Sequence, residues 1–129
     1  VSLNNGLRKI QMGAFAGTAI EEINIPGSVE SIETAGFVGR GKNKLKKVTL
    51  TEGLKIIYDA AFLACDFESV VIPESVVKVG LGIFAGNVKL KNIYCKAKSK
   101  PEQWDKNWNS KGSKPPSIGT YKVTWGYKG

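Results

Sequence analysis

The apolar positions of the chain recur with a period of about 22 residues. One column is made of phenylalanines, separated by steps of 22, 25 and 22 residues: Phe15, Phe37, Phe62 and Phe84. Two aliphatic columns precede it with the same three steps: Leu7, Val29, Leu54 and Val76, then Ile10, Ile32, Ile57 and Val79. Such self-similarity is typical of a solenoid, in which each unit buries its apolar side chains against its neighbours.

A further pattern predicts one short strand in each unit. Four segments share the same spacing of three apolar residues: 20–25, 45–50, 67–72 and 90–95. Alternation at the end of each segment directs apolar side chains inward and the residues between them outward. Stacked in parallel, the strands would form a continuous ladder with a spacing of about 4.8 Å.

These periodicities predict an α/β-class repeat fold that is rich in β-structure. We expect a right-handed leucine-rich repeat solenoid with short parallel strands, turns and short helical segments. Residues 1–95 would form an array of about four units. Residues 1–7 align with residues 48–54, so the first unit is expected to be truncated at the N-terminus.

Residues 96–129 differ from the repeats in composition. They contain all three tryptophans, and the run from Pro101 to Trp108 predicts a short helix with Trp104 and Trp108 on one face. A strand is expected over residues 121–125, where apolar and polar residues alternate. We interpret this segment as a C-terminal cap, and the alternative is an aromatic platform for a sugar ring or a peptide.

Several columns together resemble one known family of repeats. Three segments carry the likeness: residues 20–32 (IEEINIPGSVESI), residues 61–65 (AFLAC) and residues 67–84 (FESVVIPESVVKVGLGIF). Over residues 1–95 the chain resembles the BspA-like (Treponema-type) leucine-rich repeats. It departs from their pattern in the cysteine column, which reads Thr18, Arg40, Cys65 and Asn87. The resemblance implies a bacterial protein, extracellular or on the cell surface, that binds other macromolecules.

The composition argues against most catalytic chemistry. Histidine is absent, which removes the usual general base and the commonest zinc ligand. Cys65 and Cys95 fall in inward-facing columns, which indicates buried core thiols. Without a phosphate-binding loop or a metal motif, we predict neither an enzyme nor a cofactor. No apolar run is long enough to span a membrane, and no motif indicates nucleic-acid binding.

The net charge of +8 is concentrated in the tail, where residues 96–129 carry eight lysines against two acidic residues. A basic segment attracts anionic polymers at low salt, although a solvated lysine-rich tail is the simpler interpretation. A second basic stretch falls in the longer second unit, at Arg40, Lys42 and Lys44. Insertions in solenoids often form binding loops, so these residues are a candidate basic loop.

We expect a non-enzymatic module that binds other macromolecules through the concave face of its strands. A protein is the expected partner, and an anionic polymer or a carbohydrate is the alternative class of ligand. The candidate contact residues face outward on the four strands: Glu22, Asn24, Lys47, Thr49, Ser69, Val71, Asn92 and Tyr94. Val71 and Tyr94 are apolar or aromatic where a solvated strand would carry polar groups.

Two alternatives to this function follow from the same repeats. The chain could be a structural spacer, the capped end of a longer surface array without a ligand of its own. Attachment to an anionic wall polymer through the basic tail is the other alternative. The open N-terminal end would in addition allow self-association.

Overall fold

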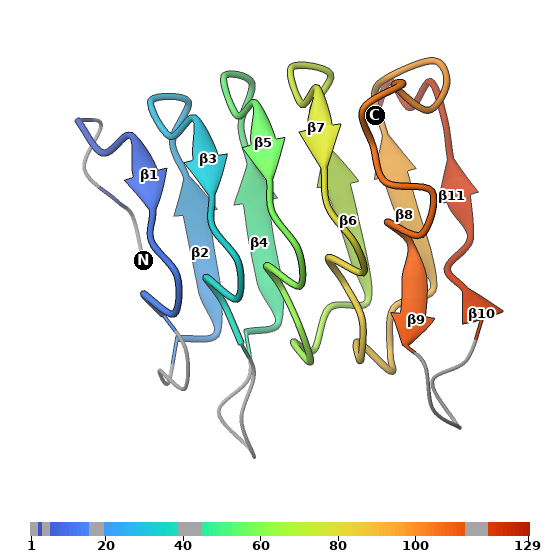
Figure 1. Cartoon of the computed structure of the whole chain (residues 1–129), viewed down its shortest axis with the longest axis horizontal. Helices are drawn as coiled ribbons and strands as arrows, with labels where there is room; N and C mark the ends of the chain where they lie inside the picture. The colour runs from blue at the N-terminus through green and yellow to red at the C-terminus, as the bar shows by residue number, and fades with distance from the viewer. Residues whose placement is uncertain (1–2, 4–5, 16–19, 39–44, 113–118) are drawn as a thin grey trace.

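Short parallel strands stacked along one axis form the protein, as the computed structural model shows (Figure 1). The structure describes residues 3, 6–15, 20–38, 45–112 and 119–129. One sheet contains four two-residue strands in the order β1–β3–β5–β7: Lys9–Ile10, Ser31–Ile32, Ile56–Ile57 and Lys78–Val79. Longer strands lie beside them: β2 (Glu22–Ile25), β4 (Lys47–Leu50), β6 (Ser69–Ile72) and β8 (Asn92–Cys95). The β-rich solenoid of short parallel strands predicted from the periodicity is confirmed.

The phenylalanine column forms a stack of aromatic rings through the interior. Successive ring centroids from Phe15 through Phe37 and Phe62 to Phe84 lie 5.0, 5.2 and 5.6 Å apart, with nearly parallel rings. Phe62 and Phe84 are completely buried. Each buried side chain of this size contributes roughly 1.5–3 kcal/mol, so the columns read from the sequence are the core that joins the units.

The predicted short helical segments are absent, because no helix occurs in the described ranges. Ala35, Ala60 and Ala64 adopt positive φ angles of 53°, 53° and 56° close to the phenylalanine column. A left-handed residue breaks the repeating dihedrals that a helix requires, so the chain turns at these positions instead.

The predicted helix at Pro101–Trp108 was also wrong, since this segment continues the solenoid. Trp104 forms a parallel bridge with Val79, and the N–H of Asp105 donates to the Val79 carbonyl at 2.8 Å. Trp104 therefore extends the column of Ile10, Ile32, Ile57 and Val79 by one place. Hydrogen bonding to the neighbouring strand stabilises this segment more than the local helical preference of residues 101–108 does.

The rest of the tail takes the place of a further turn. The N–H groups of Ile83 and Gly86 donate to the carbonyls of Trp108 and Lys111, at 3.3 and 3.0 Å. Three strands occur here: β9 (Ser110–Gly112), β10 (Gly119–Thr120) and β11 (Val123–Thr124). β9 and β10 pair with each other, whereas β11 lies parallel to β8 (Figure 1). The tail thus supplies the hydrogen-bond partners that the last repeat would otherwise lack.

Asn87 and Tyr121 join the tail to the interior. The Asn87 side chain donates from Nδ2 to the carbonyls of Phe62 and Phe84, both at 2.9 Å, and accepts at Oδ1 from the N–H of Phe67 at 3.2 Å. The Tyr121 hydroxyl lies 2.9 Å from the Phe84 carbonyl and accepts from the Asn87 N–H at 3.1 Å. Both residues are buried, so their hydrogen bonds are shielded from water.

Burial raises the pKa of the Tyr121 hydroxyl above its usual value, although the hydrogen bond with the Asn87 backbone opposes this effect. The unfolded chain therefore loses the proton before the folded protein does. This contribution to stability is complete below pH 10, the pKa of an unfolded tyrosine, and declines as the pH rises through the folded pKa. We expect Tyr121→Phe to flatten the fall of unfolding free energy between pH 9 and 11, as measured by urea unfolding.

A second titrating group, the Cys95 thiol, is present in both wild type and Tyr121→Phe. Burial also raises the pKa of the Cys95 thiol, to about 12, and this thiol weakens the fold at high pH in both proteins alike. The difference between the two pH profiles therefore reports Tyr121. Equal slopes for wild type and variant would show that the hydroxyl is not held in its protonated form by the fold.

Candidate functional site

The outward side chains of β2, β4, β6 and β8 share one surface, which we call the long-strand face. Register pairs place Glu22 beside Lys47, Asn24 beside Thr49, Ser69 beside Asn92, and Val71 beside Tyr94. Five of the candidate contact residues are exposed: Glu22, Asn24, Lys47, Thr49 and Ser69. Val71 and Tyr94 are half-buried. The face therefore presents only polar candidate residues on β2 and β4, whereas Val71 on β6 and Tyr94 on β8 add apolar and aromatic surface.

Asn92 does not have the open position expected of a contact residue. It is only 9% exposed, and its Nδ2 donates to Thr124 Oγ1 at 2.9 Å. Asn92 is buried because β11 pairs with the edge of β8 and covers this end of the face. The same tail places Tyr127 against Tyr94, with ring centroids 4.6 Å apart. Asn92 therefore bonds to the tail, and the Tyr127 ring covers part of Tyr94.

The strand ladder of the long-strand face is interrupted between β4 and β6. β2 pairs with β4, and β6 pairs with β8 and β11, but no ladder joins the two groups. The short-strand sheet beneath runs without a break from β1 to β7. A continuous ladder was predicted from the sequence, so this interruption, which we call the seam, is a correction to it.

Side chains at the seam are less buried than their equivalents elsewhere. Leu50 is half-exposed, whereas Ile25, Ile72 and Cys95 in the same column are 0% exposed. Because β6 does not close against β4, the last apolar side chain of β4 reaches the surface. Apolar area that water can reach in this way favours contact with another molecule.

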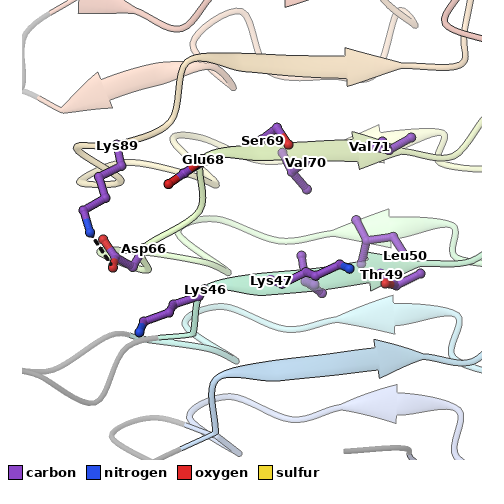
Figure 2. A pocket seen from close by; sticks show the side chains of 11 residues that line it. Lys46, Lys47, Thr49, Leu50, Asp66, Glu68, Ser69, Val70, Val71 and Lys89 are labelled. Carbon is purple, nitrogen blue, oxygen red and sulfur yellow. Dashed lines mark hydrogen bonds and ion pairs between the residues drawn. The ribbon is translucent and has the colours of Figure 1, made fainter. Parts of the chain in front are cut away.

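A groove of about 560 Å³ lies over the seam. Its size falls within the range of about 300–1,000 Å³ that is usual for ligand-binding pockets. One end is lined by charged side chains: Lys46, Asp66, Glu68 and Lys89 (Figure 2). The other end is uncharged and partly apolar: Thr49, Leu50 and Val71 (Figure 2). The groove follows the strand direction and joins two chemically different ends.

The charged end contains ion pairs of unequal strength. Lys89 Nζ lies 3.2 Å from Asp66 Oδ2, and the Asp66 side chain is only 15% exposed. Lys46 lies 3.9 Å from the exposed Glu21, where solvent leaves an ion pair worth at most about 1 kcal/mol. Lys47 and Glu68 have no ion-pair partner in the part of the chain that the structure describes.

Seven of the groove residues were absent from the sequence-based list of contacts: Lys46, Val48, Leu50, Asp66, Glu68, Val70 and Lys89. Val48, Leu50 and Val70 fall at inward-facing positions of the strand pattern, which predicts that they belong to the core. Lys89 was not considered. Their joint position follows from the seam, and the signal that could have indicated it is the larger Phe67 in a column of Ile20, Leu45 and Leu90.

The candidate basic loop of Arg40, Lys42 and Lys44 lies outside the described residues. The two cysteines are buried as predicted, at 1% and 0% exposure for Cys65 and Cys95. The Cys65 thiol donates to the Phe37 carbonyl at 3.3 Å, and Cys95 is protonated at neutral pH. Neither position presents an accessible thiolate, which a nucleophilic cysteine requires.

The tail tryptophans offer little surface for a ligand. Trp104 and Trp108 are each 2% exposed and meet edge to face, with centroids 4.8 Å apart. Trp125 is half-buried against both of them. A sugar ring needs an open aromatic face, so these rings are packed in a manner that suits an interior role.

Across the described ranges, no helix is long and apolar enough to cross a membrane.

Comparison with known proteins agrees with the repeat geometry. Residues 8–101 match the BspA type leucine rich repeat region in six copies. Among solved structures, the chain is similar to the pneumococcal vaccine antigen PcpA, with 27% sequence identity and a TM-score of 0.63. The likeness covers 74% of this chain and 25% of the antigen chain. None of the functionally curated proteins matches the sequence.

Such repeats are typically non-enzymatic interaction modules. The match extends over most of the chain and includes the strands that form the long-strand face. The chain therefore belongs to the BspA-type leucine-rich repeat family.

Proposed function

We propose that the protein is a macromolecule-binding module that recognises a protein partner through the long-strand face. The observation that carries this proposal is the groove of about 560 Å³ at the centre of the face. It combines half-exposed apolar side chains, Leu50 and Val71, with charged and hydroxyl groups. Mixed lining of this kind provides both contact area and orientation for a bound segment.

The comparisons support an extracellular or cell-surface location for this activity. The similar antigen is a pneumococcal protein, and we infer a comparable bacterial surface or secreted setting here. The chain spans about a quarter of that antigen, so the proposal concerns a module and not the whole of a longer protein.

We also propose that residues 1–95 are the array and that residues 96–129 end it. Support comes from Trp104 and Trp108, which are buried at the end of the array, with Trp104 bridged to Val79 of β7. An end segment that covers the last apolar column prevents further stacking. Self-association would then be confined to the opposite end of the solenoid, next to β1.

A matched pair of substitutions tests the binding face. Val71 on β6 and Ile56 on β5 are both β-branched and half-buried, and they lie on the long-strand face and in the short-strand sheet respectively. Val71→Arg places a long charged side chain in the groove, whereas Ile56→Arg places one on the short-strand sheet. We expect Val71→Arg to weaken capture of a partner from surface extracts by about tenfold or more, as is usual at the centre of an interface. Ile56→Arg should leave capture unchanged.

The same measurement distinguishes the alternatives. Quantitative mass spectrometry of captured proteins at 150 mM salt would give equal lists for all three proteins if the chain were only a spacer. Binding that disappears for all three between about 50 and 200 mM salt would instead indicate a polyanion held by the basic tail. Either result would contradict recognition by the long-strand face.

A further inference from the structure

The turns that follow β4 and β6 are joined across the seam by side chains. The Glu52 carboxylate accepts from the N–H groups of Glu74 and Ser75, both at 3.0 Å. The Ser75 hydroxyl accepts from the Gly53 N–H at 3.0 Å and donates to the Leu54 carbonyl at 2.7 Å. We call these hydrogen bonds the Glu52 clasp. The clasp connects the two strands just beyond their ends, although no ladder joins them along their length.

The turns that follow β2 and β4 are held together in a different way. Gly27 occupies the position equivalent to Glu52 and has no side chain with which to bridge. The two backbones approach each other directly, since a Cβ added at Gly53 would clash with the Gly27 carbonyl. β2 and β4 also pair over all four of their residues. At the seam, direct backbone contact is replaced by side-chain bridges, which can adjust to a change in strand separation through their rotamers.

The short-strand sheet continues without a break beneath the seam. β5 pairs with both β3 and β7, so the units on either side of the seam stay joined along this line. At the start of the long strands, the Asp66 N–H donates to the Leu45 carbonyl at 2.8 Å. These attachments and the Glu52 clasp surround the middle of β4 and β6, where no ladder joins the two strands among the described residues.

Opposing effects act on β4 and β6 at the seam. Closure would bury the half-exposed Leu50 and would let backbone groups of the two strands bond to each other. An open seam instead keeps the charged groups of the groove lining in water, and removing such groups from water is costly. A ladder would fix one arrangement, and the seam has none.

We propose that the seam is a joint, at which the β2–β4 half of the long-strand face moves toward and away from the β6–β8–β11 half. The movement turns on the continuous short-strand sheet and is limited by the Glu52 clasp. Collective movements of this kind take microseconds to milliseconds. The inference goes beyond the proposed function, because it concerns the protein without any partner. Its consequence for binding is a groove of adjustable width.

Nitrogen-15 relaxation dispersion on the complete 129-residue protein measures movement on this timescale. We expect exchange broadening at the amides of β4, β6 and the two clasp turns, and at least about threefold smaller contributions in β8. Glu52→Ala removes the carboxylate from the clasp. It should increase the population of the minor state about two- to fivefold, because the two lost hydrogen bonds belong to the observed arrangement.

Glu30→Ala is the matched control for Glu52→Ala. Glu30 is likewise exposed, and its carboxylate also bridges neighbouring units, accepting from Arg8 at 3.1 Å. The units that it bridges are joined by the β1–β3 ladder, away from the seam. Broadening at β4 and β6 should therefore remain as in wild type.

A disulfide across the seam tests the movement independently. Thr49 and Val71 line the groove from opposite sides, and they would face each other if β4 and β6 paired in the register of their neighbours (Figure 2). Paired strands lie about 4.8 Å apart, which a disulfide can span. Thr49→Cys/Val71→Cys should cross-link on oxidation and lose the broadening at β4 and β6. Asn24→Cys/Thr49→Cys, on the intact β2–β4 ladder, should cross-link and keep the broadening at β6. The native thiols, Cys65 and Cys95, are buried and do not compete.

Four outcomes would overturn the joint or its limit. Flat dispersion profiles in both wild type and Glu52→Ala, or equal broadening in all strands, would show that the seam does not move separately. A seam pair that stays reduced while the ladder pair cross-links would show that β4 and β6 never approach each other. Broadening that persists in the cross-linked seam protein would place the movement elsewhere. Equal effects of Glu30→Ala and Glu52→Ala would reject the clasp as the limit of the movement.

Discussion

Replacing Asn87 with alanine is expected to destabilise the protein by about 3–5 kcal/mol and to lower its melting temperature by about 10–20 °C. The substitution removes three hydrogen bonds at once, to the carbonyls of Phe62 and Phe84 and from the N–H of Phe67. The Phe62 carbonyl and the Phe67 N–H stay buried and do not regain a partner from water, whereas the Phe84 carbonyl keeps its hydrogen bond with the Tyr121 hydroxyl at 2.9 Å. Loss of a buried network of this kind is among the few mechanisms that produce effects of this size.

The neighbouring unit suggests a control for this prediction. Cys65 occupies the same column as Asn87, and its thiol donates to the Phe37 carbonyl as Asn87 Nδ2 donates to the Phe62 carbonyl. Asn87→Cys should therefore retain one of the three bonds and lose about 1–2 kcal/mol less than Asn87→Ala. Asn24→Ala, at an exposed asparagine of β2, should change the unfolding free energy by less than about 0.5 kcal/mol.

Thermal unfolding followed by circular dichroism measures all three variants. An Asn87→Ala protein with the melting temperature of wild type would show that the hydrogen bonds of this column contribute little. The prediction also bears on the family resemblance, because Asn87 departs from the cysteine of the pattern. In the structure the Asn87 side chain donates to a backbone carbonyl of the preceding unit, as the Cys65 thiol does, and it makes two further hydrogen bonds. The departure from the family pattern therefore preserves the structural role of this column.

Periodicity predicted those parts of the fold that depend on side chains repeating at equivalent positions. Phe62 and Ile57 are buried as their columns require, and Cys65 is a core thiol. Equivalent residues of successive units lie in nearly the same environment, so the inward direction of one side chain predicts the inward direction of its equivalents. The predicted continuous ladder was wrong, since β4 and β6 are not joined by one. Periodicity assigns equivalent strands the same pairing and therefore gives no sign of an interruption between two of them.

The tail could not be predicted in the same way, because it has no period. Residues around Trp104 carry a proline and an i, i+4 pair of tryptophans, which are local signals for a helix. Their pairing with Val79 is a contact between segments 25 positions apart, which no local signal reports. The burial of Asn92 has the same origin, since Thr124 reaches it from a strand that the repeats do not contain.

Truncating Trp104 is expected to cost about 3–5 kcal/mol, the usual range for a buried tryptophan. The indole is 2% exposed, contacts the rings of Trp108 and Trp125, and donates from Nε1 to the Val76 carbonyl at 3.2 Å. Trp104→Ala leaves a cavity at the end of the short-strand column and a buried carbonyl without a partner. Trp104→Phe should cost less, about 1–3 kcal/mol, because it retains most of the ring volume.

Two spectroscopic probes show whether the tail and the repeats form one cooperative unit. All three tryptophans lie in residues 96–129, so fluorescence reports the tail, whereas far-ultraviolet circular dichroism reports mainly the strands. We expect both transitions to shift together in Trp104→Ala and to remain coincident, because the tail supplies hydrogen-bond partners to Val76, Val79 and Ile83. Gln103→Ala, at the exposed neighbouring position, should shift neither transition. A fluorescence transition that moves while the circular dichroism transition stays in place would mean that the repeats fold without the tail, and that residues 96–129 do not stabilise the array.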